Sequence, residues 1–319
     1  MYNSENLCTA KQDDVRRDPM TTPKVSVLTT AYNPGDYLDL ALQSLYGQSF
    51  ADFEHILVDN GCADDSIDRL TDLDPRCRLT RFEQNIGRTP ALQRAFEQAT
   101  GEYVAILDAD DVWHASHLQR QIETIESRPN VVLVGTWCRW IDENGKEKNR
   151  TVRPTEPDDI RDRMSWENPI SNSSALFRRD VAVELGGYDE DFPFAQDFDL
   201  WLKMVQVGDP VILPEYLTDI RVLTSSVTHN PAHGLSRAYD EVRLYRRAGR
   251  QLKLSRKARR SNRISTASMA VNYGNALRAT GKRLSGTQWI LWAMLRDPLV
   301  LLRRFASGQR SRMLGGASA

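Results

Sequence analysis

The feature that most constrains the fold is an alternation of two sequence patterns in the first half of the chain. Runs rich in β-branched and other apolar residues predict buried strands over 24–32, 53–61, 78–85, 102–111 and 131–141. Between them, apolar residues recur at helical spacing and predict helices over 37–48, 66–73, 91–100 and 116–127. Strands that alternate with helices form parallel βαβ units. The sequence therefore predicts an α/β fold, with a mixed, mostly parallel sheet flanked by helices.

The pattern changes after residue 141. The segment 142–170 is charged and lacks a regular period, although 142–150 is typical of a turn or hairpin. Later apolar patterns predict a strand and a short helix in 171–190, an amphipathic helix in 195–208 and a pair of strands in 209–223. From 235 to 319 the chain is predicted to be helical. Residues 1–22 are polar, lack the apolar core of a signal peptide, and are expected to form a flexible leader.

Charge is distributed unevenly along the chain. The formal net charge is −1, but residues 237–319 contain 19 Lys and Arg against 3 Asp and Glu, which leaves 23 basic and 40 acidic residues in 1–236. A basic segment of this kind can attract anionic lipid, or it can dock on the acidic part of the same chain. The four cysteines lack metal-ligand spacing, so we expect reduced thiols and a cytoplasmic protein.

Polar side chains follow four of the predicted strands. Asn33, Asp59 and Asn85 each come just after an apolar run, and the sequence DADD at Asp108–Asp111 ends the run VAIL. The carboxyl ends of parallel strands meet at one edge of a sheet, which is where ligands bind in this fold class. We therefore expect these groups to converge on one crevice. The alternative is that each group only caps its own loop.

The DADD sequence has the chemistry of a metal site. Alternate residues of an extended segment point the same way, so Asp108 and Asp110 can both face the crevice while Ala109 faces the core. Two carboxylates that leave room for water and phosphate oxygens suit Mg²⁺ or Mn²⁺. A calcium EF-hand is disfavoured, because Trp113 stands at the sixth position of the loop, where glycine is needed. The alternative is an acidic helix N-terminus, with Asp111 as a cap.

Four longer stretches resemble segments of a known family. In chain order they are VSVLTTAYNPGDYLDLALQSLYGQSF, HILVDNGCADDS, NIGRTPALQRAFEQATGEYVAILDADD and LGGYDEDFPFAQDFDLWLKM. Together they resemble glycosyltransferase family 2, whose members have a GT-A fold and invert the sugar configuration. The resemblance spans 24–229. It implies a GT-A domain over 23–234, with a nucleotide half over 23–130, an acceptor half over 131–234, and a basic helical C-terminal extension over 235–319.

The resemblance also implies roles for single residues. Tyr32 would offer a flat face to the nucleotide base, and Asp59 would accept a hydrogen bond from that base. Asp110 would bind the metal ion that bridges the donor diphosphate. The full set of expected donor-binding residues is Thr30, Tyr32, Asn33, Asp59, Asn85, Gly87, Arg88 and Asp108. The alternatives for these residues are strand or turn capping, a core tyrosine and a surface arginine.

Asp197 is the expected catalytic base. Inverting transfer needs a carboxylate that takes the proton of the acceptor hydroxyl as that hydroxyl attacks the anomeric carbon. Asp197 begins an amphipathic segment, and the N-terminus of a helix would stabilise its anion. Asp199 is a rival for the role, and Asp197 could instead be an N-cap. Trp201 could stack on a sugar or belong to the core.

The sequence departs from the family pattern at three positions. Gln196 stands where a glutamate usually precedes the base, and Asn172 and Leu223 stand where histidines are common. His229 or His233 could replace one of the missing histidines. We expect these differences to affect the acceptor site or the metal site.

The apolar segment 289–305 is interrupted by Arg296, Asp297 and Pro298, so neither part is long enough to cross a bilayer. Its tryptophans and arginines suit an interfacial helix, and packing on the rest of the chain is the alternative. The expected location is the cytoplasm, with peripheral contact at the inner face of the membrane through the C-terminal helices. The sequence lacks the interleaved basic and aromatic residues typical of nucleic-acid binding, so no nucleic-acid partner is expected.

Together the motifs predict a metal-dependent inverting glycosyltransferase. Its donor would be a nucleotide-sugar, with a UDP-sugar favoured, and its acceptor would be a glycan or lipid-linked glycan of a surface polysaccharide. One alternative is a nucleotidyltransferase of similar fold, which would normally have a glycine-rich loop with Lys or Arg after the first strand; TTAYNPGD lacks this loop. Another is an inactive sugar-nucleotide-binding module, for which Gln196 is the only support.

Overall fold

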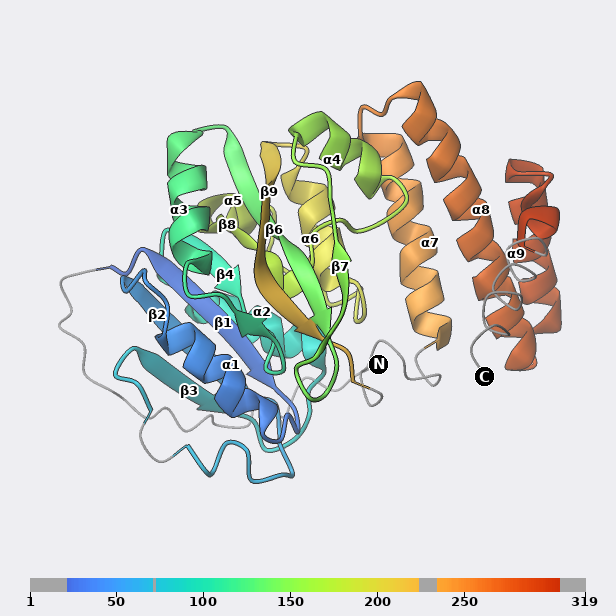
Figure 1. Ribbon diagram of the computed structural model, residues 1–319. Helices are drawn as coiled ribbons and strands as arrows, with labels where there is room; N and C mark the ends of the chain where they lie inside the picture. Colours follow the sequence, from blue (N-terminus) through green and yellow to red (C-terminus); the bar gives the residue numbers. More distant parts are fainter. Residues whose placement is uncertain (1–21, 71–72, 224–233, 305–319) are drawn as a thin grey trace. The chain divides into compact units, whose positions relative to one another are not determined.

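The computed structural model describes residues 22–70, 73–223 and 234–304, so His229 and His233 lie outside the described residues. The described residues form two compact units. The first comprises the residues up to 160 together with 169–223, and the second comprises 161–168 together with 234–304. The first unit contains the sheet, and the second is helical (Figure 1).

Four strands form a parallel half of the sheet, in the order β3-β2-β1-β4. They are β1 (Val25–Ala31), β2 (Phe53–Asp59), β3 (Cys77–Arg81) and β4 (Tyr103–Ile106). Val25 lies opposite both Phe53 and Tyr103, and all three strand pairings are parallel. β1 and β2 are buried along nearly their whole length, as expected for parallel strands covered on both faces. The loops that carry the predicted site residues therefore leave the sheet at one edge.

The other half of the sheet is mixed. Beyond β4 the order continues with β8 (Leu176–Arg178), β6 (Val131–Ile141), β9 (Asp209–Arg221) and β5 (Val112–Trp113), and β7 (Glu147–Thr151) pairs with β6. β8 runs antiparallel to both β4 and β6, whereas β6 and β9 are parallel. The predicted α/β fold with a mixed sheet is confirmed, and the parallel pairings are concentrated in the first half.

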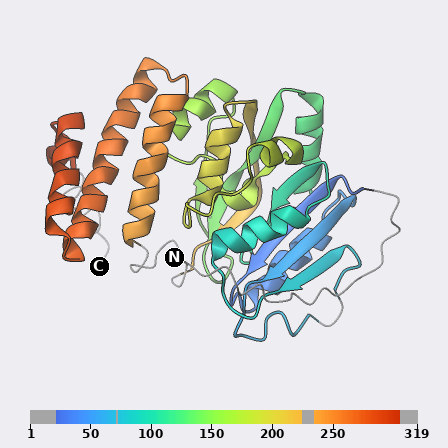
Figure 2. The same ribbon diagram turned by 180° about the vertical axis from the view of Figure 1, so that it is seen from behind.

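Helices cover both faces of the sheet (Figures 1 and 2). The helices of this unit are α1 (Tyr37–Tyr46), α2 (Arg88–Gln98), α3 (His117–Ser127), the 3-10 helix η1 (Asn172–Ser174), α5 (Arg179–Glu184) and α6 (Gln196–Met204). Leu45 of α1 and Leu118 of α3 join one core cluster on the same face. Phe96 of α2 and Trp201 of α6 both contact Phe177 of β8 on the other face.

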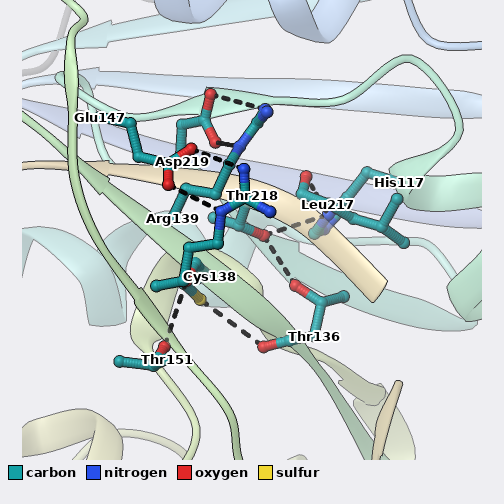
Figure 3. A network of polar contacts seen from close by, with 10 residues as sticks. His117, Thr136, Cys138, Arg139, Glu147, Thr151, Leu217, Thr218 and Asp219 are labelled. Carbon is teal, nitrogen blue, oxygen red and sulfur yellow. Dashed lines mark hydrogen bonds and ion pairs between the residues drawn. The ribbon is translucent and has the colours of Figure 1, made fainter. Parts of the chain in front are cut away.

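A polar network fixes the register of the long strand β9 (Figure 3). Arg139 of β6 donates two hydrogen bonds to Asp219 of β9, at 2.6 and 2.9 Å. The hydroxyls of Thr136 and Thr218 lie 2.9 Å apart, and Nδ1 of His117 lies 3.3 Å from the Thr218 hydroxyl. The threonines and the histidine are buried, so each contact satisfies polar groups that water does not reach. The network thereby sets the position of the residues that end β9.

The helical unit contains α7 (Gly234–Gln251), α8 (Arg256–Ala279) and α9 (Arg283–Arg296), together with the last residues of α4 (Pro157–Met164). Its core includes Val242 and Ala293. α8 and α9 approach closely at Gly274 and Gly286, because a Cβ on Gly274 would lie only 2.6 Å from the carbonyl oxygen of Gly286. Among the described residues, no helix has both the length and the apolar character needed to cross a bilayer.

Three local predictions were wrong. The helix predicted at 66–73 is a turn over 66–69, in which the Asp64 side chain accepts hydrogen bonds from the N–H and hydroxyl of Ser66; residues 71 and 72 lie outside the described residues. The predicted strand pair at 209–223 is the single strand β9, which continues through register shifts opposite β6. The segment predicted to be irregular contains α4, which begins at Pro157 with two acidic residues in its first turn.

Candidate active site

The loops that follow β1 and β2 are tied together by side chains. Asn33 has a left-handed backbone (φ 49°), which asparagine tolerates better than most residues. Its side-chain oxygen accepts a hydrogen bond from the N–H of Ala63 at 2.7 Å, and its own N–H donates to Cys62 Sγ at 3.3 Å. Asp59 accepts a hydrogen bond from the N–H of Cys62 at 2.8 Å. One oxygen of Asp59 therefore caps the turn after β2.

Asn60 joins the loop after β2 to the loop after β3. Its side-chain N–H groups donate to Asn85 Oδ1 and to the carbonyl of Gly87, both at 3.2 Å. Asn85 Oδ1 also accepts from the N–H of Gly87 at 2.8 Å. Gly87 has a φ of 100°, which residues with a side chain rarely adopt, and it directly precedes α2. Arg88 is consequently the first residue of that helix, and the three predicted loops meet at one edge of the sheet.

Arg88 connects α2 to the carboxyl end of β4. Its Nη2 donates to Asp108 Oδ2 at 2.9 Å, while Asn172 Nδ2 donates to Asp108 Oδ1 at 2.8 Å. Both oxygens of Asp108 therefore have partners within the chain. The charge of Asp108 raises the pKa of Arg88, and the charges of Asp197 and Asp110 add to this effect. The guanidinium thus lies among three of the predicted site carboxylates.

Asp111 is buried and does not cap a helix. Its Oδ1 accepts the N–H of Arg221 at 2.8 Å, and its other oxygen accepts the hydroxyl of Ser173. The Arg221 guanidinium donates to the carbonyl of Asp110 at 3.0 Å and lies 4.6 Å from the centroid of the Tyr37 ring. Burial, together with the charges of Asp110 and Asp108, raises the pKa of Asp111 well above its usual value.

Asp110 differs from its two acidic neighbours, because its carboxylate makes no hydrogen bond or ion pair with any other described residue, and its own backbone N–H is the hydrogen-bond donor that acts on it. Burial and the charge of Asp108 raise the pKa of Asp110 to about 6, and Arg88 opposes this shift. Within the described ranges, no three His, Cys, Asp or Glu side chains are grouped as a metal site. A cation at Asp110 would therefore take further oxygens from water or a ligand, as Mg²⁺ commonly does. The uncommitted carboxylate fits that requirement.

Asp197 lies in the first turn of α6, two residues after the N-cap Ala195. Burial raises the pKa of Asp197, and the charge of Arg88 lowers it. Tyr188 is buried close by, since the charges of Asp197 and Asp108 act with burial to raise its pKa. The Tyr188 hydroxyl has no hydrogen-bond partner among the described residues. Buried hydroxyls normally have one, so Tyr188 is a candidate for contact with a bound ligand.

The remaining predicted residues are divided between the site edge and the core. Thr30 is half-buried near the end of β1, and Tyr32 beyond it is 52% exposed, so its ring is open to a ligand. Asp199, the rival base, is fully buried and forms an ion pair with Lys203 at 2.7 Å. Trp201 is fully buried, so it belongs to the core and does not present its ring to a sugar.

Four residues of the site were not predicted from the sequence. Arg221 and Ser173 contact Asp111 across 110 and 62 positions of the chain, and no local pattern links such distant residues. The Tyr188 hydroxyl could not be identified either, because its lack of a hydrogen-bond partner depends on residues that pack around it in the fold and not on a local sequence pattern. Asn60 could have been found, because it directly follows Asp59 at the end of the predicted strand 53–61.

Comparison with known sequences gives a consistent result. A family model described as glycosyl transferase family 2 matches residues 26–186. The amylovoran biosynthesis glycosyltransferase AmsE of Erwinia amylovora is 32% identical over 228 residues, which cover 69% of this chain and 84% of AmsE. The O-antigen biosynthesis glycosyltransferase WbnJ of Escherichia coli is 28% identical over 186 residues, which cover 57% of this chain and 71% of WbnJ.

Solved structures share the fold at low sequence identity. S. aureus TarS 1–349 in complex with UDP-GlcNAc matches with a TM-score of 0.62 and 18% identity, covering 85% of this chain and 79% of that chain. The match to a longer TarS chain covers 43% of it. The mannosyltransferase PcManGT of Pyrobaculum calidifontis, in complex with GDP-Man and Mn²⁺, matches with a TM-score of 0.59 and 21% identity over 90% of both chains. The chain therefore belongs to glycosyl transferase family 2 and is a glycosyltransferase with the GT-A fold.

Proposed function

We propose that this glycosyltransferase moves a sugar, with inversion, from a nucleotide-sugar to a hydroxyl of a glycan or lipid-linked glycan during surface polysaccharide synthesis. The main support is the partnerless carboxylate of Asp110 beside the Arg88–Asp108 ion pair, which is an arrangement suited to a metal-bound diphosphate. The names of the relatives AmsE and WbnJ support the polysaccharide context. A UDP-sugar is the favoured donor, in line with TarS, which was solved with UDP-GlcNAc; a GDP-sugar is the alternative, because PcManGT was solved with GDP-Man.

The donor would occupy the edge formed by the nucleotide half, residues 23–130. The exposed ring of Tyr32 offers a stacking face for the base, and Thr30 lies beside it. Asp59 caps its turn through Oδ1, and its Oδ2 is the atom left for the base N–H. Gly87 permits close approach of the loop that Asn85 holds in place, and Arg88 brings positive charge towards the diphosphate.

A divalent ion, Mg²⁺ or Mn²⁺, would bind to Asp110. When bound, such an ion neutralises negative charge that develops on the departing diphosphate. Asp108 would shape the site from beside it, because Arg88 and Asn172 already hold both of its oxygens. Asp111 and Arg221 would position Asp110 through its backbone, since Arg221 donates to the carbonyl of Asp110.

Asp197 would act as the general base in the acceptor half, residues 131–234. The acceptor oxygen forms a bond to the anomeric carbon, the bond from that carbon to the diphosphate oxygen breaks, and the acceptor proton passes to the Asp197 carboxylate. Burial raises the pKa of Asp197 and makes it a stronger base than a solvated aspartate, while the charge of Arg88 opposes this rise. The buried hydroxyl of Tyr188 would donate to substrate oxygens or to Asp197.

The helical unit, within the proposed extension 235–319, would contact the inner face of a membrane from the cytoplasm. Leu284 and Leu295 of α9 are 84% and 85% exposed, which is unusual for leucines of a packed helix. The basic charge of this segment would add attraction to anionic lipid.

A thermal-shift screen tests the donor proposal. UDP-, GDP- and dTDP-sugars are each added with Mn²⁺ or with EDTA. We expect a UDP-sugar to raise the melting temperature only with Mn²⁺, and we expect this shift to be lost in Asp110→Ala and kept in Asp197→Ala. A shift that persists in Asp110→Ala would contradict the metal site. Donor binding without any transfer would favour the inactive binding module instead.

A further inference from the structure

Three arginines of the helical unit line one cavity of about 330 Å³. Arg246 and Arg250 lie on α7, and Arg296 ends α9. Trp292 lies between them, since the guanidinium of Arg246 is 5.2 Å and that of Arg296 is 5.6 Å from its ring. A second cavity of about 360 Å³ shares Arg246 and Arg250. Two contacts with the Trp292 ring and a shared cavity thus place three positive charges around one space.

The arginines are close enough to affect one another. Burial lowers the pKa of Arg296, and the charges of Arg246, Arg250 and Arg263 lower it further. Nε of Arg296 is buried and has no hydrogen-bond partner among the described residues, although its Nη2 donates to Asn262 at 3.3 Å. Positive charges that lie close enough to shift one another's pKa repel, and an anion between them would relieve this repulsion.

The carboxylates of this unit interact with groups other than the three arginines of the cavity. They are Asp162, Glu167, Asp240, Glu241 and Asp297. Asp162 accepts the N–H of Ser255, Glu167 pairs with Arg163, Asp240 with Arg243, and Asp297 with Arg303; Glu241 interacts with the charge of Arg237. Within the described part of this unit, no ion pair neutralises Arg246, Arg250 or Arg296.

The C-terminal ends of two helices partly stabilise the positive charges of these arginines. Arg250 and Arg296 lie in the last turns of α7 and α9, where a cation interacts favourably with the helix dipole. Each helix end supplies roughly half an elementary negative charge, so two ends do not balance three guanidinium groups. Arg246 lies a turn further inside α7 and gains less from the dipole.

We propose that Arg246, Arg250 and Arg296 form a binding site for a phosphate or diphosphate group in the helical unit. Guanidinium groups bind phosphate oxygens through paired N–H donors, and several of them converge here around one cavity. The Trp292 ring holds two of the three side chains by cation–π contact and leaves their remaining N–H groups for the ligand. This site consists of other residues than the carboxylate site of the sheet unit, and the proposal does not depend on the donor proposal.

Two sources could supply this phosphate chemistry. One is a phosphate-bearing lipid, which the exposed Leu291 and Leu295 of α9 would accompany into a bilayer. The other is a free phosphorylated compound in solution. The binding experiment therefore needs one soluble ligand and one membrane ligand.

The test measures binding to the full chain in EDTA, so that no divalent metal supports binding at Asp110. Inorganic pyrophosphate is titrated by calorimetry, and flotation measures binding to phosphatidylcholine vesicles with or without phosphatidic acid. The double variant Arg250→Gln/Arg296→Gln is compared with Arg256→Gln/Arg260→Gln, which removes two exposed α8 arginines outside the cavity. We expect the cavity variant to weaken binding at least about tenfold and the control variant less than about threefold.

The outcomes separate the two sources. Cavity-dependent binding of pyrophosphate alone identifies a soluble ligand, and cavity-dependent binding of the acidic vesicles identifies a lipid headgroup. Equal weakening by both double variants would overturn the proposal, because it would show only general attraction to a basic surface. Absence of binding in both arms would also overturn it. If the double variant does not fold, Arg250→Gln alone serves, since Arg250 is exposed, and we expect about a threefold loss or more.

Discussion

The two halves of the sheet build the candidate site in different ways. In the parallel half, short loops after consecutive strands bond to one another, as the Asn33–Ala63 and Asn60–Asn85 contacts show. In the mixed half, single side chains arrive from distant parts of the chain, and Arg221 reaches Asp111 across 110 positions. The parallel half therefore forms the edge on which a donor would lie. The mixed half supplies most of the hydrogen-bond partners of the DADD carboxylates, and so influences which carboxylate has no partner and could bind a ligand.

The three aspartates of DADD show what this difference produces. Asp108 is held by Arg88 of the parallel half and Asn172 of the mixed half. Asp111 is held entirely from the mixed half, by Ser173 and Arg221. Asp110 is left without a side-chain partner among the described residues. Asp108, Asp110 and Asp111 are thus close in sequence but differ in their hydrogen-bond partners.

The largest expected effect tests whether the mixed half supplies the proton acceptor. Asp197→Asn keeps the shape of the side chain but removes its basicity, so we expect turnover to fall about 1,000-fold. Donor affinity, measured by calorimetry with Mn²⁺, should change less than about twofold, because the proposed donor site lies in the parallel half. Asp199→Asn is the matched control for the rival base. A greater loss of turnover in that variant would reverse the assignment, provided that both variants melt at similar temperatures.

The second prediction contrasts adjacent carboxylates in their effect on stability. Asp111→Ala leaves the N–H of Arg221 and the Ser173 hydroxyl without their buried acceptor, and should lower the free energy of unfolding by about 2–3 kcal/mol. Asp110→Ala removes a charge that lies close to the charge of Asp108 and has no partner in another described residue. The free energy of unfolding should therefore change by less than about 0.5 kcal/mol, or increase. Urea unfolding measures both. Equal destabilisation would mean that Asp110 has a structural role.

Local sequence patterns predicted most elements of both halves, including β6, β8, α5 and α6 of the mixed half, but not the contacts that the mixed half makes with the site. The strands, the helices and the positions of Asn33, Asp59, Asn85 and Asp108 could be predicted, because each depends on residues a few positions apart. The roles of Arg221 and Ser173 depend on how β9 and η1 pack beside β4, which no short window contains. The turn over 66–69 was not predicted, because apolar residues recur there at helical spacing.

The third prediction compares a buried histidine from each half. Burial lowers the pKa of His55 in β2 and of His117 in α3 to about 3. The folded protein keeps both neutral, whereas the unfolded chain takes up protons below about pH 6.5, so stability falls as the pH drops from about 6.5 towards 3. Each histidine should account for about 1 kcal/mol of the loss between pH 6.5 and 5.5.

Urea unfolding at these two pH values measures the loss. His55→Gln and His117→Gln should each reduce the pH-dependent part by about 1 kcal/mol, whatever their effect at pH 6.5. If the halves unfold separately, the two variants will affect different transitions. An unchanged pH dependence in both variants would show that neither histidine is held neutral.

The smallest change in turnover is expected for Tyr188, which is buried close to Asp108 and Asp197 and contacts Phe96 of α2. Tyr188→Phe removes a buried hydroxyl that has no partner among the described residues, so the free energy of unfolding should change by less than about 0.5 kcal/mol. Turnover should fall about three- to tenfold if the hydroxyl donates to substrate. Unchanged turnover with a substantial loss of stability would assign Tyr188 to the core alone.

We propose that Asp110 is the one carboxylate of DADD available to a metal ion. The most direct test is a Mn²⁺ titration followed by electron paramagnetic resonance in the presence of saturating UDP, using the wild type, Asp110→Asn and Asp197→Asn. We expect Asp110→Asn to weaken Mn²⁺ binding at least about tenfold and Asp197→Asn to leave it unchanged. Equal Mn²⁺ affinity in the wild type and Asp110→Asn would contradict the claim and place the metal, if any, on other ligands.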